Sequence, residues 1–547
     1  MLETPSAKSS WTYRIQVSLK RMPSLSSAWF HFGDKLQLDG SSARRWFRIV
    51  IWPLVGVLSI VKFFYLVADF PNYSPWMIDQ AKFTDEGWWA SAAVRHVLTG
   101  HWYVQGDYNP AIALPVWPAL VALVFHFTGV SVVAARALSV VISLATLGVV
   151  FALVRRYTRT EVPALIAVLL MAASPFAFTF GRLAVLDTLV VFEFCLLMLV
   201  ASFASAKRIW PLVVLSLLIF TMMLTKTTAV LLVPAVFWAA WSAMGRGPAG
   251  LLKAVLAVGV LPAALFKGYA ALVVKLGYGD DYHYFFDVNA MPDIDWHQTF
   301  ATLSTFFQNC FWIDRVLYPV LLLILILTVV WKRKLWSNSL FTASWIALAA
   351  QSAFIFSRQD DYAPRYFLVM LAPLVCIAAL TFAELMVHAK IPAVLMLGVI
   401  AASLIANVLM IEQFLTHCDY DFRDAARGIQ EIIRSHPEQK PLILGVSGSQ
   451  LSLMTGIPSI NDGFGTEDMA KKVASYQPGW YLVWNDISPD SEGFLSPYRL
   501  EKMASYPVFD DDERSTLILY RMVRRDDGSR ARLPPTAEFH APAMAGH

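Results

Sequence analysis

Long apolar runs alternate with short polar segments over the first three quarters of the chain. A helix needs about 17 to 25 apolar residues to cross the hydrocarbon layer of a membrane. About eleven runs reach this length, and each predicts a spanning helix: residues 49–70, 131–154, 161–180, 182–204, 209–224, 227–243, 251–273, 314–331, 338–356, 365–386 and 391–411. Residues 113–128 are nearly as apolar, but a span there would invert every later loop, so we expect an interfacial or re-entrant helix.

The amino-acid composition supports a membrane location. Hydrophobic residues make up 57% of the chain and charged residues only 15%, and the mean hydropathy of +0.53 lies outside the usual range of soluble domains. The formal net charge of +4 is small and scattered between apolar runs, which gives no support to nucleic-acid binding. The predicted fold class is a polytopic α-helical membrane protein.

Basic residues predict the orientation of the chain. They gather in the first 48 residues and in alternate gaps between apolar runs, at residues 155–159, 207–208, 246, 332–334 and 390. Lys and Arg concentrate in cytoplasmic loops, so we expect a cytoplasmic N-terminus in a multi-pass protein of the inner (plasma) membrane. The first 48 residues lack the apolar segment of a cleavable signal peptide. The complementary loops, including residues 71–130, then face the extracytoplasmic side.

The composition changes after residue 411, where apolar runs shorten to strand length. Strands are predicted at residues 441–446, 480–484 and 516–520, and helices at 421–433 and 498–504. These elements indicate a small extracytoplasmic α/β domain over residues 412–524, following a membrane domain over residues 49–411. We expect residues 525–547, rich in Asp, Gly, Pro and Ala, to be disordered.

The four cysteines show no metal-binding spacing. Cys195 and Cys376 fall inside apolar runs and are expected to be packing residues. Cys310 and Cys418 both fall on the predicted outer side, where a disulfide could form, although nothing in the sequence requires one.

Two adjacent carboxylates stand at the edge of the first predicted span. Asp85 and Glu86 precede two tryptophans, in a string that reads Thr84-Asp85-Glu86-Gly87-Trp88-Trp89. Charges beside spanning segments are scarce and are functional candidates by default. The alternative is an interfacial helix whose carboxylates merely face solvent.

Several short motifs around this pair resemble the GT-C glycosyltransferases of the protein O-mannosyltransferase and lipid A aminoarabinose transferase type. Each motif is weak alone, but their order, spacing and common side of the membrane are together specific. Besides Asp85-Glu86, they are Gly100-His101-Trp102, Asn109-Pro110, Ala135-Arg136-Ala137-Leu138, Arg182 with Leu186-Asp187-Thr188, Leu224-Thr225-Lys226, and Arg365-Tyr366-Phe367 with Pro373.

The resemblance implies transfer of a sugar from a polyprenyl-phosphate donor on the outer face of the membrane, with inversion at the anomeric carbon. It assigns Asp85 as the general base that takes the proton of the acceptor hydroxyl, with Glu86 as a supporting neighbour. The acceptor stays open between lipid A, another envelope glycan and a protein. The alternative class is a transporter or flippase, but its ionisable residues would be expected near the bilayer midplane in repeated halves.

Such a reaction needs cations for the leaving phosphate, and the resemblance suggests Lys226, Arg365, Arg182 and Tyr366 as donor-binding residues. Arginine contacts phosphate oxygens with a fork and lysine with a point charge. The alternative is that these basic residues snorkel to lipid headgroups. Asp187 lies inside a predicted span and needs a partner, which is either a structural pair with Arg182 or a cation that Asp187 orients.

The remaining candidates concern sugar and metal binding. The aminoarabinose transferases carry a Glu-Lys-Pro-Pro string late in the first outer loop, and here the matching stretch has neither the glutamate nor the lysine. A divalent cation held by Asp85 with Asp107 or Asn109 is therefore less favoured. Aromatic, acidic, amide and histidine side chains that could bind the sugar are Trp88, Asp107, Tyr108, Asn109, Tyr282, His283 and Asp361.

Overall fold

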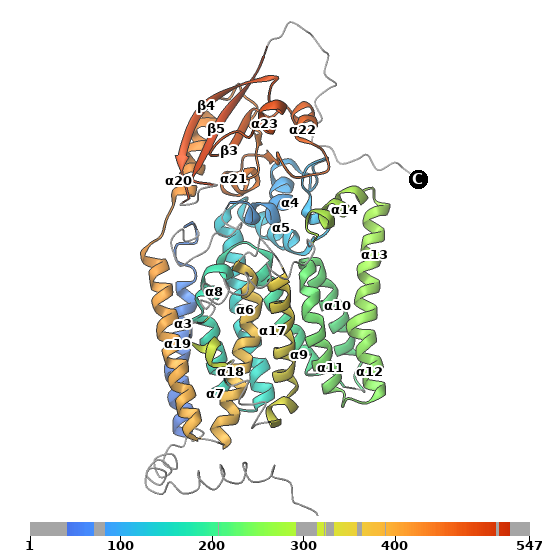
Figure 1. Cartoon of the computed structure of the whole chain (residues 1–547), viewed down its shortest axis with the longest axis vertical. Coiled ribbons are helices and arrows are strands. Elements are labelled where there is room, and N and C mark those ends of the chain that lie inside the picture. The colour runs from blue at the N-terminus through green and yellow to red at the C-terminus, as the bar shows by residue number, and fades with distance from the viewer. Residues whose placement is uncertain are drawn as a thin grey trace, which may run out of the picture.

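The structure of the chain, a computed structural model, describes residues 41–69, 83–205, 207–290, 314, 316–321, 323, 333–357, 364–388, 390–509 and 514–525. Long helices form a bundle, a small sheet lies at one end of it, and two short helices lie between the two (Figure 1). The predicted class, a mostly helical membrane protein with a C-terminal α/β unit, is confirmed at this level.

The bundle consists of helices that match the predicted apolar runs in order. α3 ends at Val61, earlier than the predicted end at residue 70. The helices of the bundle are α3 (Ser41–Val61), α6 (Val132–Thr158), α7 (Val162–Ala172), α8 (Pro175–Thr179), α9 (Leu186–Ala201), α10 (Trp210–Thr225), α11 (Val233–Ala243), α12 (Pro248–Ala254), α13 (Leu261–Lys275), α17 (Ser339–Ser357), α18 (Leu368–His388) and α19 (Lys390–Thr416).

Short helical turns interrupt or precede several of these helices. They are η3 (Phe180–Arg182), η4 (Thr227–Leu232), the π-helical η5 (Val255–Val260), η7 (Arg333–Ser337) and η8 (Pro364–Phe367). Between α7 and α8 the direction changes by 61°. There the Ser174 side chain accepts from Ala177 N–H and Pro175 occupies the first helical position, a pair of signals that starts a new helix.

Not every predicted span has the length of a membrane crossing. Within the described residues, four helical stretches are long and apolar enough, or five if α7 with α8 counts as one bent span. The four are Val132–Thr158, Pro248–Lys275, Arg365–His388 and Ile391–Ser435, and four shorter apolar helices accompany them. The exact number of spans stays a prediction, and most of the run 314–331 lies outside the described residues.

Three of the helices form the interior of the bundle. Every residue of α7 and the first fifteen of α18 are buried, and most of them share one hydrophobic core with α9 from Val190 onward. The start of α9, at Leu186 and Leu189, is buried in a second core that includes residues of α4 and α5. By contrast, α3, α13 and α19 carry many exposed apolar side chains. The starts of α9 and α18 are therefore fixed by packing on all sides, which suits them to hold charged side chains at defined positions.

Two short helices connect the bundle to the sheet. α4 (Asp85–Thr99) packs against α5 (Val116–Thr128), and the turn η2 (Pro110–Ile112) precedes α5. α5 has 13 residues, fewer than a helix needs to cross a membrane. Both helices lie between the sheet and the bundle, near α14 (Gly279–Val288) (Figure 1).

The C-terminal part is a five-stranded mixed sheet with the strand order β2-β1-β3-β5-β4. β1 pairs in parallel with β2 and β3, whereas β5 pairs antiparallel with β3 and β4. The strands and their helices are α20 (Asp421–Ser435), β1 (Ile443–Leu444), α21 (Gly448–Thr455), β2 (Ser459–Ile460), α22 (Met469–Tyr476), β3 (Trp480–Trp484), α23 (Pro489–Phe494), β4 (Tyr498–Pro507) and β5 (Thr516–Arg524).

One predicted helix is wrong. Residues 498–504 belong to β4, which pairs with β5 along its whole length. The strand lies at the edge of the sheet and its side chains are half-buried or exposed, so it lacks the apolar alternation that reveals a central strand. Its conformation is decided by the pairing partner, which the local sequence does not show.

Candidate active site

Asp85 is the first residue of α4, which lies between the bundle and the C-terminal sheet (Figure 1). Its side chain is 3% exposed and forms an ion pair with Arg365 in η8. Thr84 Oγ1 donates to Asp85 Oδ1 at 3.1 Å. A carboxylate in the first turn of a helix is also stabilised by the helix dipole. The structure thus holds the predicted base in a buried, charge-paired position.

Asp187 joins this pair to a second cation. It lies in the first turn of α9, where its Oδ1 accepts from Lys226 Nζ at 2.6 Å and its Oδ2 is 3.7 Å from Arg365 Nε. Asp85, Arg365, Asp187 and Lys226 therefore form one row of alternating charges, called here the charge cluster. Their side chains are 3%, 6%, 2% and 14% exposed. The cluster carries two positive and two negative formal charges.

Breaks between helices position these side chains. Lys226 lies between α10 and η4 with an extended backbone (φ −157°, ψ 125°), and Arg365 lies in η8 immediately before α18. At such ends the backbone leaves the helix, so a side chain can turn toward a neighbouring helix end. The sequence separates these residues widely, and the packing of α9, α10 and α18 brings them together.

A small pocket adjoins the charge cluster. Asp187, Lys226 and Tyr366 line one part of it, and Gln351 and Phe354 of α17 line another. Lys226 Nζ lies 4.3 Å from the centroid of the Tyr366 ring, which fixes the ammonium by a cation–π contact. Two of the predicted donor-binding residues, Lys226 and Tyr366, thus lie beside an open volume, and Arg365 is their neighbour.

Glu86 has a different environment from Asp85. Its side chain is fully buried. Glu86 Oε1 accepts from Arg136 Nε at 2.8 Å and Oε2 accepts from Arg136 Nη2 at 2.5 Å, so the two side chains form a bidentate ion pair. The backbone N–H of Ala184 donates to Oε1 at 2.8 Å, and Gln450 Nε2 donates to Oε2 at 3.2 Å. These contacts occupy both carboxylate oxygens. They suit a supporting role in which Glu86 anchors the start of α4.

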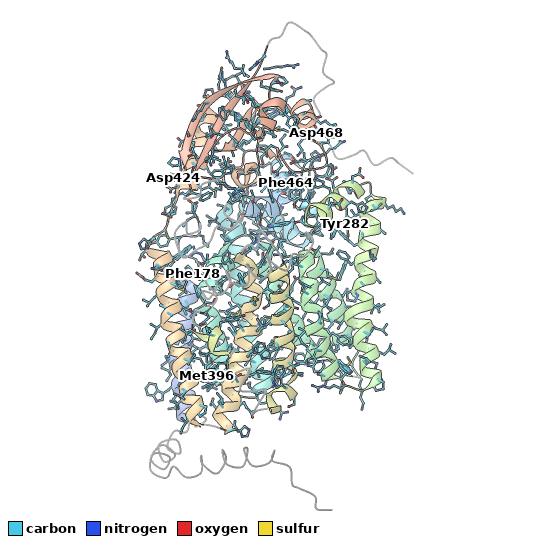
Figure 2. All side chains as sticks on the ribbon, viewed as in Figure 1. Phe178, Tyr282, Met396, Asp424, Phe464 and Asp468 are labelled. Atoms are coloured by element: carbon cyan, nitrogen blue, oxygen red, sulfur yellow. The ribbon has the colours of Figure 1, made fainter. Side chains whose placement is uncertain are left out.

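Aromatic rings gather close to Asp85. Trp88 contacts Tyr108 and Phe464 with ring centroids 5.3 and 4.9 Å apart, and Tyr108 also contacts Tyr284. Burial raises the pKa of Tyr108, and the Asp85 charge adds to this effect. Phe464 comes from the C-terminal part and lies at its junction with the helices (Figure 2). This surface can stack on the apolar face of a sugar ring.

Asp107 and Asn109 belong to a polar network beside the aromatic rings. Arg95 pairs with Asp107 and donates to Asn109 Oδ1 at 2.9 Å. Lys472 Nζ lies 3.4 Å from Asp107 Oδ1, and Asn109 Nδ2 donates to Asp281 Oδ1 at 2.9 Å. Burial raises the pKa of Asp281.

This network does not fit the metal site considered from the sequence. The oxygens that Asp107 and Asn109 would offer already accept from Arg95, and two cations surround Asp107. Among the described residues no group of three or more His, Cys, Asp or Glu side chains is arranged to hold a metal ion. No step of the chemistry proposed below passes through a metal.

The other predicted residues are dispersed. Tyr282 is buried against Phe286, whereas His283 next to it is exposed. Arg182 lies in η3 and has no contact with Asp187, whose partners are Lys226 and Arg365. Asp361 lies outside the described residues, as does Cys310, one of the two cysteines that a disulfide could join.

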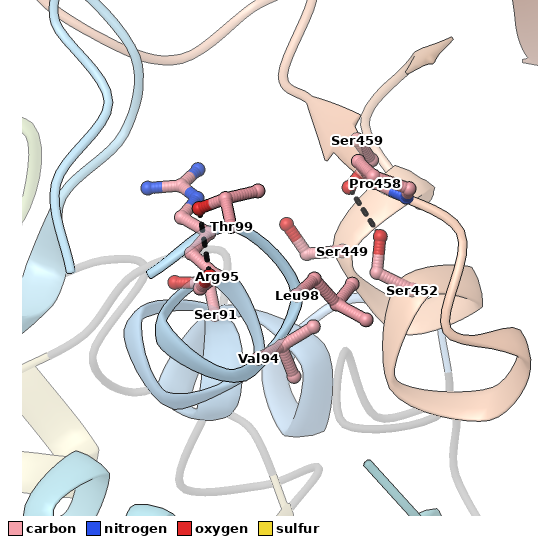
Figure 3. A pocket seen from close by; sticks show the side chains of 9 residues that line it. All are labelled: Ser91, Val94, Arg95, Leu98, Thr99, Ser449, Ser452, Pro458 and Ser459. Carbon is pink, nitrogen blue, oxygen red and sulfur yellow. Dashed lines mark hydrogen bonds between the residues drawn. The ribbon is translucent and has the colours of Figure 1, made fainter. Parts of the chain in front are cut away.

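The C-terminal part contributes residues that the sequence did not suggest. Gln450 in α21 contacts Glu86 and also accepts from Gly87 N–H at 2.7 Å. A Cβ on Gly87 would lie 2.2 Å from Gln450 N, so α4 and α21 approach as closely as only glycine permits. Between the two helices lies a small pocket that includes Ser91 and Ser449 (Figure 3). No local signal connects Gln450 with a carboxylate 364 residues away.

Comparison with known proteins agrees with this architecture. The model of the dolichyl-phosphate-mannose-protein mannosyltransferase family matches residues 110–267. The crystal structure of ArnT from Cupriavidus metallidurans in the apo state superposes with a TM-score of 0.56 at 15% identity, over 88% of this chain and 98% of that chain. The chain shares the fold of ArnT. The predicted resemblance to GT-C glycosyltransferases is confirmed.

A second structure of the same protein shows a similar match. ArnT from Cupriavidus metallidurans bound to undecaprenyl phosphate superposes with a TM-score of 0.55 at 15% identity, over 86% of this chain and 98% of that chain. No curated protein sequence matches the chain.

Proposed function

We propose that the chain is an inner-membrane glycosyltransferase that moves a sugar from a polyprenyl-phosphate donor to an envelope acceptor. The charge cluster carries this proposal, because it places a buried carboxylate, two cations and a small pocket together at one end of an apolar bundle. The family match and the fold shared with ArnT, one structure of which holds undecaprenyl phosphate, support the donor class.

The contacts of the cluster suggest how a donor would engage it. Before binding, Arg365 is paired with Asp85 and Lys226 with Asp187. A donor phosphate that takes Arg365 as its partner would release the Asp85 carboxylate. Asp85 would then become a free base only when the donor is in place, which limits unproductive proton transfer.

The chemical step then follows from these positions. The acceptor oxygen forms a bond to the anomeric carbon while Asp85 takes its proton, and the bond from that carbon to the phosphate oxygen breaks. The electron pair leaves with the lipid phosphate. Lys226 and Arg365 stabilise the charge that grows on this oxygen, which is the larger requirement for a phosphate leaving group. Trp88 and Tyr108 are proposed to hold the sugar ring.

Orientation and acceptor form the finer part of the proposal. The basic residues between apolar runs favour a cytoplasmic N-terminus, with the charge cluster and residues 412–524 on the extracytoplasmic side. Lipid A, another glycan and a protein are all compatible acceptors, because the described pocket walls come from several elements and do not select one of them.

Substitution Asp85→Asn tests the assignment of the base. The amide keeps the shape of the side chain but cannot take a proton, so we expect transfer from a polyprenyl-phosphate sugar to fall at least about 100-fold while donor binding is retained. Asp424→Asn, which changes an exposed acid in α20, serves as the control. Undiminished turnover by the Asp85 variant would remove this residue as the base.

Substitution Lys226→Ala tests the role of the cations. We expect about tenfold to 100-fold weaker binding of undecaprenyl phosphate, since a charge-assisted contact to phosphate is lost. Lys471→Ala, at a lysine that is 68% exposed, controls for a general loss of positive charge. Equal affinity of the Lys226 variant and the control would contradict phosphate binding at the charge cluster.

A further inference from the structure

Lys62, directly after α3, and Arg182, in η3, are two buried basic residues. Lys62 is 0% exposed and Arg182 is 4% exposed. Lys62 Nζ donates to two neutral acceptors, Ser143 Oγ at 3.1 Å and the Ala177 carbonyl at 3.0 Å. Within the described residues neither cation has a carboxylate partner.

The Arg182 guanidinium retains an unused donor. Its carbon lies 4.7 Å from the ring centroid of Phe178 and 5.0 Å from that of Phe414, and Nη2 donates to the Phe64 carbonyl. Nη1 is buried and has no hydrogen-bond partner, and the same is true of Thr179 Oγ1. Both residues line one small pocket.

An unpaired buried cation is costly, because burial removes its hydration. Four other buried cations have a carboxylate partner: Arg136 pairs with Glu86, Arg365 with Asp85, and both Arg95 and Lys472 with Asp107. Among the described residues Arg182 lacks such an anion, and its Nη1 together with Oγ1 of Thr179 marks where one would be held.

The surroundings of this pocket point to the membrane as the source of the anion. Phe63, Phe64 and Tyr65, which follow α3, are 41%, 51% and 50% exposed. Tyrosine is enriched at the headgroup layer, and the two exposed phenylalanines beside it present apolar surface to the membrane. The pocket also touches Phe414 of α19, and α3 and α19 lie side by side at one edge of the bundle (Figure 1). Phe178 lies near this edge, away from Tyr282 (Figure 2).

The pocket wall also contains one acid, Asp69. Its Oδ2 accepts from Phe422 N–H at 2.8 Å, so this carboxyl is engaged with the start of α20. No residue of the wall belongs to the charge cluster. Arg136, which also lines the wall, donates from all three guanidinium nitrogens to Glu86 and to the carbonyls of Leu66 and Ala68. Arg182 is therefore the wall cation that can donate to a ligand.

We propose that Arg182 and Thr179 form a binding site for the phosphate group of a membrane lipid, separate from the charge cluster. A phosphate oxygen would accept from Arg182 Nη1 and Thr179 Oγ1, and its negative charge would offset that of Arg182. The acyl chains would lie along the exposed apolar surface of α3 and α19. This site goes beyond the proposed transferase function and does not depend on it.

Thermal unfolding of the purified, delipidated full chain in detergent tests the site. We expect dioleoylphosphatidylglycerol to raise the unfolding midpoint of the wild type, while dioleoylglycerol and inorganic phosphate do not. Arg182→Gln should raise the lipid concentration needed for half the shift by at least about tenfold. Thr179→Val, a milder change that keeps the side-chain shape, should raise it by about fivefold.

Two further variants separate this site from other cations. Arg246 is an exposed arginine whose guanidinium carbon lies 4.9 Å from the centroid of the Trp238 ring, so it resembles Arg182 in its ring contact. Arg246→Gln should keep the full lipid response. Lys226→Ala should keep it as well, since the charge cluster is a different site. A lipid shift that survives Arg182→Gln and Thr179→Val, or vanishes in Lys226→Ala, overturns the proposal. An equal shift with inorganic phosphate would also overturn it, because the ligand would then be a free anion.

Discussion

Asp187 competes with a donor phosphate for the same two cations, and its removal should have an unusual effect. Asp187→Asn keeps a carbonyl oxygen where Oδ1 now accepts from Lys226 Nζ at 2.6 Å. The position of the lysine should therefore be retained. The substitution changes the formal charge of the cluster from zero to +1, so the affinity for lipid phosphate should rise instead of falling.

The size of this effect follows from the burial of the cluster. The Asp187 side chain is 2% exposed, so solvent screens it poorly. A phosphate on Lys226 and Arg365 would lie roughly 6 Å from Asp187, and at an effective dielectric constant of about 20 the lost repulsion is about 2 to 3 kcal/mol. Partial exposure of Lys226 reduces this value. We expect about tenfold to 100-fold tighter binding of undecaprenyl phosphate.

The assay is equilibrium binding of undecaprenyl phosphate to purified protein, combined with multiple-turnover transfer. Tighter binding of the lipid product should slow its release, so turnover should fall while product affinity rises. The unliganded variant should unfold at a lower temperature, because a buried cation has lost its partner, and added lipid phosphate should restore it. Asp187→Ala, which also removes the acceptor oxygen, is the matched comparison. Weaker or unchanged binding by Asp187→Asn would refute the competition between carboxylate and phosphate.

Two other predictions concern the junction with the C-terminal part. Gly87→Ala places a methyl group 2.2 Å from Gln450 N, which should push α21 away from α4. We therefore expect faster amide hydrogen exchange in α21 and reduced sugar transfer. Unchanged exchange would argue against tight docking of α21 on α4. Burial raises the pKa of Asp69 to about 7, with Asp421 adding to the rise and Arg136 opposing it. The folded chain then holds this proton more tightly than the unfolded chain, so stability should fall as pH rises from the ordinary value of 3.8 to about 7 and should level off above it. Thermal midpoints of Asp69→Asn should lose that decline.

The sequence was informative about the membrane part because its signals are local. Apolar runs of spanning length predicted the positions of α6, α10 and α18 closely, since each helix satisfies its own backbone hydrogen bonds. The strand β3 was predicted at its observed bounds, because it is short, apolar and buried. The edge strand β4 was missed, because its pairing with β5 decides its conformation.

The chain by itself also identified the individual members of the charge cluster, since a charge at the end of an apolar run is conspicuous. It left the partner of Asp187 open between Arg182 and another cation. Only the tertiary structure paired Asp187 with Lys226 and Arg365, and it gave Arg182 no carboxylate partner within the described part of the chain. The physical reason is that these contacts depend on how helix ends far apart in the sequence pack together. Hydrophobic periodicity determines which segments become helices, but it does not determine which buried charge faces which.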